Sequence, residues 1–133
     1  MIKDKIQIIK RNKIEDSRGW FLKVITGTES NLPKSTGEVY LTLANPGEMK
    51  GGHYHLLANE WFTLITGNCL LKLQDVKTKE YKEIVLNSND PVTIYVPYGI
   101  AHAFFNTSKE ADFILLAYSD QLFNPVDTIN FSF

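Results

Sequence analysis

The sequence predicts an all-β protein, a small antiparallel sandwich or barrel. Short runs of alternating apolar and polar residues recur along the chain, and Gly, Pro, Asn and Asp separate them at turn positions. Almost no segment shows a helical period. About ten strands at this spacing are typical of a closed or two-sheet β architecture.

The N-terminal third supplies three of these strands. We expect strands at residues 5–10 and 20–25, separated by the turn Asp16-Ser17-Arg18-Gly19. Residues 37–45 alternate apolar and polar side chains, which predicts a strand with one face on a core. Pro46-Gly47 then turns the chain.

The rest of the chain continues the series. Further strands are expected at residues 61–66, 68–74, 81–86, 92–96, 103–106 and 113–118. The tail, residues 122–131, is rich in aromatics and should pack on the barrel or on a second subunit. No repeat, linker or low-complexity segment interrupts the chain, so we expect residues 1–133 to form one domain.

Composition restricts the class of protein. Hydrophobic residues make up 44% of the chain and charged residues 22%, with a net charge of −1, so there is no electrostatic case for binding nucleic acid or an anionic membrane. The N-terminus lacks the apolar core of a signal peptide, and no apolar run has the length of a membrane span. The single Cys69 excludes an internal disulfide and is expected in the core, so a cytoplasmic location is predicted.

Two motifs contain all three histidines of the chain. His53-Tyr54-His55 is followed by Glu60, and His102 ends the later segment Pro97-Tyr98-Gly99-Ile100-Ala101-His102. His53 and His55 leave the same face of a strand because one residue separates them. A carboxylate and a third imidazole can then meet them, a set that suits zinc first, and also iron, manganese or nickel. The alternative is that each histidine is an ordinary packing residue, but Glu60 lies among apolar neighbours where a charge needs a partner.

These motifs resemble those of the cupin superfamily. His53, His55, Glu60 and His102 stand at the four positions of the cupin metal ligands, with Gly47 and Gly67 flanking the first motif. The resemblance implies a jelly-roll barrel, also called a double-stranded β-helix. One departure is Pro91, where a glycine usually precedes the second motif.

The resemblance extends to one group of cupins. Asp16-Ser17-Arg18-Gly19-Trp20-Phe21 resembles a segment near the start of the cupins that act on nucleotide-linked 4-keto-hexoses. Lys50-Gly51-Gly52-His53-Tyr54-His55 and the ending Phe123-Asn124-Pro125 are most similar to the C-terminal cupin domain of the capsular polysaccharide reductase/epimerase. The dTDP-4-dehydrorhamnose 3,5-epimerases and the dTDP-4-keto-6-deoxyhexose 3,4-ketoisomerases share parts of this pattern. The ketoisomerases need no metal, so a metal-free site is the alternative to a metal centre here.

The resemblance implies an epimerase or ketoisomerase that removes a proton next to the ketone of a nucleotide-linked 4-keto-6-deoxyhexose. His53 or His55 can act as the base, since imidazole titrates near neutral pH, and a metal can polarise the carbonyl. A histidine bound to a metal cannot accept a proton, in which case the base is another group. Tyr118 lies where related epimerases carry an acid, and Tyr40 and Tyr95 are further candidates that line the substrate site.

Other residues are expected to bind the nucleotide. The resemblance places Arg18 near the diphosphate, which a guanidinium can hold through two hydrogen bonds. Lys50 and Lys72 can add positive charge at the mouth of the barrel. A homodimer is also expected. Two further functions fit the same motifs: a metal-dependent cupin dioxygenase and a sugar-binding cupin without catalysis.

Overall fold

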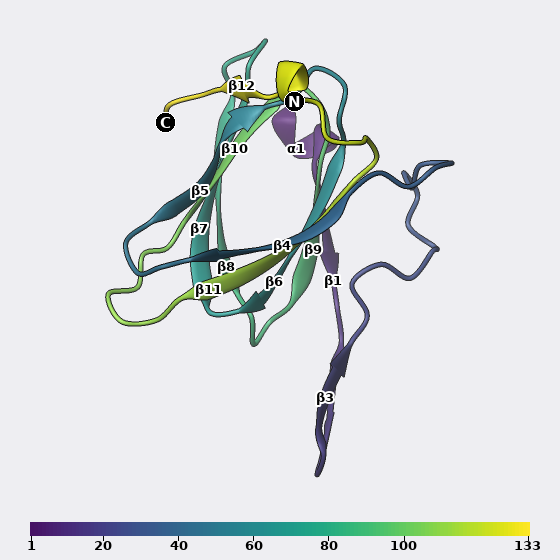
Figure 1. Ribbon diagram of the computed structural model, residues 1–133, viewed down its shortest axis with the longest axis vertical. Coiled ribbons are helices and arrows are strands. Elements are labelled where there is room, and N and C mark those ends of the chain that lie inside the picture. The colour runs from purple at the N-terminus through teal and green to yellow at the C-terminus, as the bar shows by residue number, and fades with distance from the viewer.

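Two five-stranded antiparallel sheets face each other in the computed structural model, which describes residues 1–133 (Figure 1). The first has the order β1-β9-β6-β11-β4 and contains β1 (Gln7–Lys10), β9 (Val92–Val96), β6 (Glu60–Thr66), β11 (Phe113–Ser119) and β4 (Val39–Ala44). The second has the order β12-β5-β10-β7-β8 and contains β12 (Ile129–Asn130), β5 (Met49–Tyr54), β10 (Ile100–Phe105), β7 (Asn68–Asp75) and β8 (Tyr81–Asn87). The predicted all-β class is confirmed.

The core lies between the two sheets. Side chains alternate between buried and more exposed along β7 and β11, because successive residues of a strand point to opposite faces. Leu71 and Leu73 from one sheet and Phe113 and Leu115 from the other are therefore buried in one apolar cluster. Cys69 belongs to the same cluster, as expected.

A two-stranded hairpin projects from the barrel (Figure 1). It consists of β2 (Lys13–Asp16), a strand that the sequence did not indicate, and β3 (Gly19–Leu22), which ends three residues before the predicted boundary. The predicted turn between them is confirmed. The Arg18 backbone N–H donates to Asp16 Oδ1 across 2.8 Å and closes that turn.

The N-terminus differs from the prediction. Residues Ile2–Lys5 form one helical turn, α1, so the first strand begins later than expected. Ile2 and Ile6 are buried in the core, and this contact explains why the turn packs against the barrel.

The C-terminal segment partly covers the second sheet. A short 3-10 helix, η1 (Pro125–Asp127), precedes β12, which pairs with β5. The Phe131 ring then packs on Tyr54 with centroids 6.4 Å apart. The expectation that the tail packs on the barrel is confirmed for these residues, whereas Leu122 and Phe123 stay exposed. No helix of the structure has the length and apolar character needed to cross a membrane.

Candidate active site

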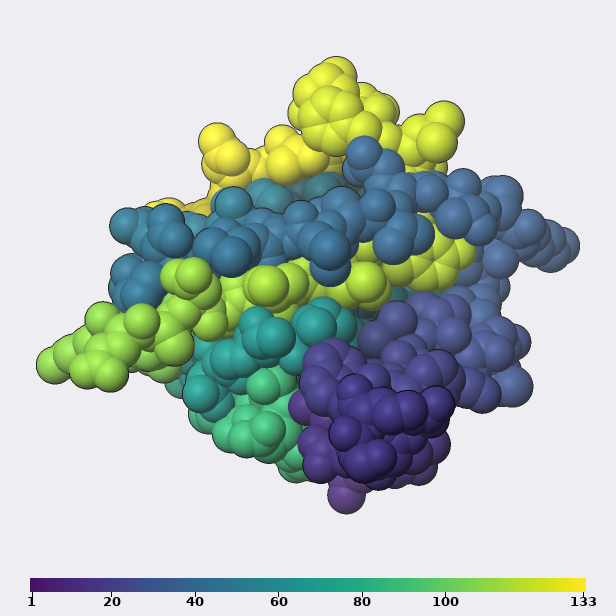
Figure 2. All heavy atoms as spheres, turned by 60° about the horizontal axis from the view of Figure 1, so that its bottom comes forward, coloured from purple at the N-terminus to yellow at the C-terminus, as the bar shows by residue number.

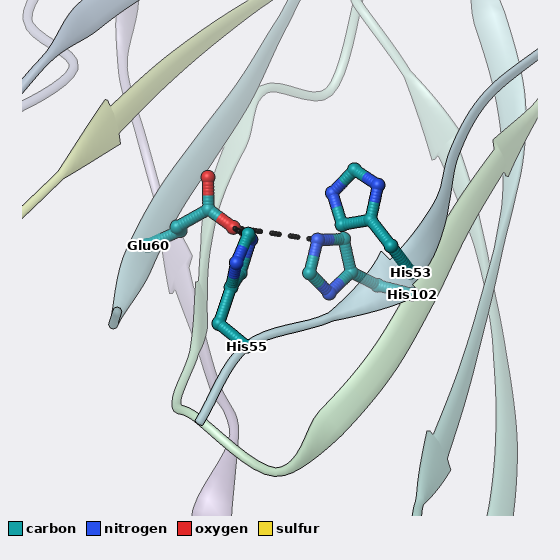
Figure 3. A group of neighbouring side chains, drawn as sticks. All are labelled: His53, His55, Glu60 and His102. Carbon is teal, nitrogen blue, oxygen red and sulfur yellow. Dashed lines mark ion pairs between the residues drawn. The ribbon is translucent and has the colours of Figure 1, made fainter. Parts of the chain in front are cut away.

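Three imidazoles and one carboxylate converge at one point inside the barrel (Figure 3). His53 lies on β5, His55 directly after it, Glu60 at the start of β6 and His102 on β10. Their ligand atoms all lie within 4.8 Å of one another. Two motifs that are far apart in sequence therefore supply one cluster, as their residues predicted.

Two glycines shape the strand that carries His53. Gly51 and Gly52 have φ angles of 85° and 79°, a region that favours glycine. A Cβ atom on Gly51 would lie 2.9 Å from the carbonyl oxygen of His102. The pairing of β5 with β10 shifts at this point, so that His53 lies directly opposite His102. This irregularity places their ring centroids 5.0 Å apart.

The Glu60 carboxylate connects the histidines with a tyrosine. Its Oε1 lies 2.8 Å from His55 Nε2 and 3.4 Å from His102 Nε2. Its Oε2 accepts a hydrogen bond from the Tyr40 hydroxyl at 3.1 Å. Burial acts to raise the pKa of Glu60, but the imidazoles of His102 and His55 outweigh it and hold that pKa well below its usual range.

Two of the rings are fixed by backbone carbonyls. His55 Nδ1 donates to the carbonyl of Asp127 at 2.8 Å, and His102 Nδ1 donates to the carbonyl of Ile100 at 3.0 Å. A carbonyl only accepts, so each Nδ1 carries a hydrogen, and in the neutral form of each ring the lone pair is on Nε2. Both Nε2 atoms face Glu60 Oε1.

The cluster fits a bound cation. His55 Nε2, His102 Nε2 and Glu60 Oε1 are buried and make no hydrogen bond. Buried polar atoms without partners are rare, and three that bear electron pairs at one point need a proton or a metal ion between them. Three imidazoles and a carboxylate match the donor set of a zinc, iron, manganese or nickel site. These four side chains can therefore hold a metal ion.

The environment controls the remaining protonation states. Burial, followed by the nearby imidazoles of His102 and His55, lowers the pKa of His53 to about 4. Burial also acts to lower the pKa of His55, yet Glu60 and the Asp127 carbonyl outweigh it and raise that pKa. Burial and then the Glu60 charge raise the pKa of Tyr40 well above its ordinary value. At neutral pH, His53 is thus neutral and Tyr40 keeps its proton.

Two cavities give access to the cluster. The larger, of about 300 Å³, lies beneath the C-terminal segment, and its lining includes Glu38, Tyr40, His53, Gln121 and Asn124. The smaller, of about 160 Å³, lies within the barrel and is lined by Lys50, Phe62, His102 and others. Tyr40 and His53 line both cavities, so these two side chains stand between the two spaces.

Two predicted tyrosines do not reach the cluster. Tyr95 and Tyr118 lie opposite Trp61 on neighbouring strands, and their rings pack on its indole with centroids 5.0 and 5.3 Å away. Glu60 points inward, so its neighbour Trp61 and both tyrosines point outward. The expectation that Tyr118 supplies an acid and Tyr95 a substrate contact to this cavity is therefore corrected. Of the three, only Tyr40 lines it.

The predicted cations also lie in different places. Arg18 is at the tip of the projecting hairpin, with 89% of its side chain exposed and its guanidinium paired with Asp16. It lines neither cavity of its own chain. Lys50 lines the smaller cavity, whereas Lys72 lies over the Phe105 ring.

The sequence did not single out several residues of the C-terminal segment. Gln121, Leu122, Phe123 and Asn124 line the larger cavity. Asp127 lines it too and contacts His55 through its carbonyl. The only sequence signal was the resemblance of this ending to the capsular polysaccharide domain.

Comparison with known proteins identifies the family. The family model described as the polysaccharide biosynthesis C-terminal domain matches residues 14–130. The chain belongs to this family. The polysaccharide biosynthesis C-terminal domain thus accounts for most of the chain, and the predicted similarity to a C-terminal domain of polysaccharide synthesis is confirmed.

One curated relative is the UDP-2-acetamido-2,6-beta-L-arabino-hexul-4-ose reductase of Pseudomonas aeruginosa. It is 26% identical over 109 residues, which are 82% of this chain and 27% of the relative. The capsular polysaccharide assembling protein CapF of Staphylococcus aureus is similar in structure, with a TM-score of 0.69 and 23% identity over 92% of this chain and 33% of CapF. This polysaccharide biosynthesis C-terminal domain therefore spans about a quarter to a third of the length of these two relatives.

Two smaller proteins share the same barrel. The dTDP sugar isomerase of Desulfovibrio desulfuricans G20 has a TM-score of 0.86 and 16% identity, covering 96% of this chain and 83% of the isomerase. The epimerase RmlC of Legionella pneumophila was solved with dTDP-4-keto-L-rhamnose. It has a TM-score of 0.83 and 15% identity, and the match covers 96% of this chain and 72% of RmlC. At these identities the likeness establishes the fold, and it confirms the predicted cupin barrel.

Proposed function

We propose that this domain epimerises or isomerises a nucleotide-linked 4-keto-6-deoxyhexose for surface-polysaccharide assembly. The observation that carries the proposal is the cluster of three imidazoles and Glu60 at the wall of a cavity of about 300 Å³ that also contains the Tyr40 hydroxyl. Membership of the polysaccharide biosynthesis family supports the biological role. The names of two solved relatives, a dTDP sugar isomerase and a dTDP-sugar 3,5-epimerase, support the reaction class.

The reaction needs a base, a donor and a group that stabilises negative charge. A carbon next to a ketone loses its proton to a base on one face, and the enolate oxygen must then be stabilised. Return of a proton to the other face inverts the centre, and return to another carbon moves the ketone. No electron is gained or lost in either case, so this chemistry requires no redox cofactor.

We assign proton exchange with the sugar to His53 and Tyr40, which both line the larger cavity. His53 is neutral at working pH and offers a lone pair as proton acceptor. Tyr40 keeps its proton and can donate it. A divalent ion held by His53, His55, Glu60 and His102 would polarise the ketone oxygen when bound. With the His53 lone pair engaged in this way, Tyr40 remains as the proton-exchanging group that is hydrogen-bonded to the cluster.

Deuterium wash-in tests the proposal. The protein is incubated in D₂O with dTDP- and UDP-linked 4-keto-6-deoxyhexoses, and the carbon-bound deuterium is measured by mass spectrometry and NMR. We expect uptake next to the ketone for at least one nucleotide sugar. A dioxygenase would instead consume O₂, and a sugar-binding protein without catalysis would bind the ligand with no uptake. The assay on chelated and on metal-loaded protein shows whether proton removal needs the free lone pair of His53.

A homodimer would complete the substrate site. No Lys or Arg lines the larger cavity, so one chain offers no cation there for a diphosphate. The hairpin that carries Arg18 exposes Ile14, Trp20 and Phe21. In Figure 2 this purple hairpin protrudes from the molecule. β4, which lies at the opposite edge of the first sheet from β1, also has exposed side chains, those of Val39, Leu41 and Leu43. We propose that a second copy covers these apolar surfaces and that its Arg18 binds the nucleotide.

A further inference from the structure

We propose that Asp127 is a positioning residue for His55. It acts through two separate groups, since its carboxylate holds the loop between β5 and β6 and its backbone carbonyl fixes the His55 ring. Only the catalytic part of this proposal depends on the proposed function.

The Asp127 carboxylate binds the loop that joins His55 to Glu60. Its Oδ1 accepts the backbone N–H groups of Leu56 at 2.8 Å and Leu57 at 3.0 Å, and its Oδ2 accepts that of Ala58 at 3.1 Å. Asp127 is only 7% exposed, so water does not compete for these bonds. Hydrogen bonds to a charged carboxylate are stronger than those between neutral groups. The carboxylate therefore sets the path of the chain between two residues of the cluster.

The backbone carbonyl of Asp127 determines which nitrogen of the His55 ring carries the hydrogen. It accepts the hydrogen of His55 Nδ1 at 2.8 Å, which leaves Nε2 free to face Glu60. The carbonyl itself is held in place because Asp127 ends a 3-10 helix whose first turn is capped by the Asn124 side chain. A carbonyl or carboxylate that orients a histidine in this way is often as important for a site as the direct ligands.

A neighbouring aspartate provides a matched control. Asp120 also accepts hydrogen bonds in the same region, from the backbone N–H of Asn59 at 2.9 Å and from its side-chain amide at 2.8 Å. It makes no hydrogen bond to a histidine and lines neither cavity. Asp120→Asn therefore weakens the attachment of the same loop without acting on the His55 ring.

The test compares D127N with D120N. Asn keeps the size of Asp but turns an NH₂ group toward backbone N–H donors, which weakens the hold on the loop. We expect D127N to lower kcat about 10- to 100-fold with KM changed less than about 3-fold, the range for outer groups that orient a site histidine. D120N should keep kcat within about 2-fold of the wild-type value, because its hydrogen bonds lie outside the histidine cluster.

A spectroscopic measurement does not depend on activity. Long-range ¹H–¹⁵N spectra of the metal-free protein at alkaline pH report which nitrogen of neutral His55 carries the hydrogen. We expect hydrogen on Nδ1 in the wild type and in D120N, and a mixture of both forms in D127N. This result would support the positioning role even if no sugar exchanged deuterium, an outcome that would overturn only the proposed function.

Two results would overturn the proposal. One is a wild-type His55 with its hydrogen on Nε2, which can be measured even if D127N fails to fold. The other is a folded D127N protein with the wild-type form of His55 and a kcat reduced no more than that of D120N.

Discussion

The hydroxyl of Tyr40 donates to Glu60 Oε2 across 3.1 Å, while the other oxygen of this carboxylate faces two imidazoles. Glu60 thus connects the candidate ion-binding atoms with the one tyrosine of the cavity. Tyr40 comes from β4, the edge strand of the first sheet, whereas His53 and His102 come from the second sheet. The site is therefore assembled across the barrel, and each sheet supplies part of the chemistry.

Tyr40→Phe removes the hydroxyl and keeps the ring. We expect kcat and deuterium wash-in to fall about 10²- to 10⁴-fold, the usual contribution of a positioned acid or base. Metal content should stay at the wild-type level, because the four ligand side chains remain. Tyr118→Phe is the matched control, since that hydroxyl lies on the outer face of the sheet, and it should leave kcat within about 2-fold. Equal losses in the two variants would contradict the assignment of Tyr40.

Glu60→Gln tests the ion site. The amide keeps the shape of the side chain but lacks the negative charge, so we expect metal content after dialysis against zinc to fall well below that of the wild type. Chelation should lower the Tm of the wild type, because an ion that binds only the folded state stabilises it, and should leave the Tm of E60Q unchanged. Glu38→Gln changes a carboxylate in the same cavity and is the control. Its metal content and its change in Tm on chelation should equal those of the wild type. If the chelator lowered the Tm of E60Q as much as that of the wild type, the result would count against the ion site.

The fold and the central cluster were predictable because they depend on local patterns. Alternation along the strands indicated the sheets, and the spacing of His53, His55 and Glu60 in one motif and His102 in another indicated their convergence. The positions of Tyr95 and Tyr118 were not predictable in the same way. Both faces of β11 carry apolar residues. The alternation of side chains along this strand therefore does not indicate which face points into the barrel.

The contact between His55 and Asp127 had no local signal at all. The two residues are 72 positions apart, and the contact depends on how the C-terminal 3-10 helix lies over the barrel. The helical turn at the N-terminus has a similar origin. Ile2–Lys5 is too short to be stable by propensity, and burial of Ile2 in the core supports it.

Gly51→Ala tests the irregular strand that aligns His53 with His102. The new Cβ would lie 2.9 Å from the His102 carbonyl oxygen, at a φ that alanine avoids. We expect a loss of about 2–3 kcal/mol in the free energy of unfolding, measured with urea. Gly47→Ala is the control, because its φ is also positive but no atom lies within 4 Å of the new Cβ, and strain alone should cost about 1 kcal/mol. Equal losses would show that close approach to His102 is not what requires glycine.

Glu29→Gln tests a buried ion pair that holds the segment before β4 on the barrel. Glu29 is bound by Arg11 at 2.6 Å and by the backbone N–H of Thr26 at 2.9 Å, and only 3% of its side chain is exposed. Burial acts to raise its pKa, but these partners lower it from 4.5 to about 2. Above pH 4.5 we expect the free energy of unfolding of E29Q to be about 1.5–3 kcal/mol lower than that of the wild type, because a hydrogen bond to a charged group contributes this much.

The pH dependence gives a second readout for the same pair. Between pH 4.5 and about 2 the unfolded chain binds more protons at Glu29 than the folded chain does, so its stabilising effect is lost as the pH falls through this window. Urea unfolding at several pH values should show the difference between wild type and E29Q shrinking toward pH 2. Asp16→Asn breaks an exposed pair with Arg18 and should leave stability unchanged at every pH. A difference between wild type and E29Q that stays constant with pH would mean that the charge of Glu29 does not hold this segment.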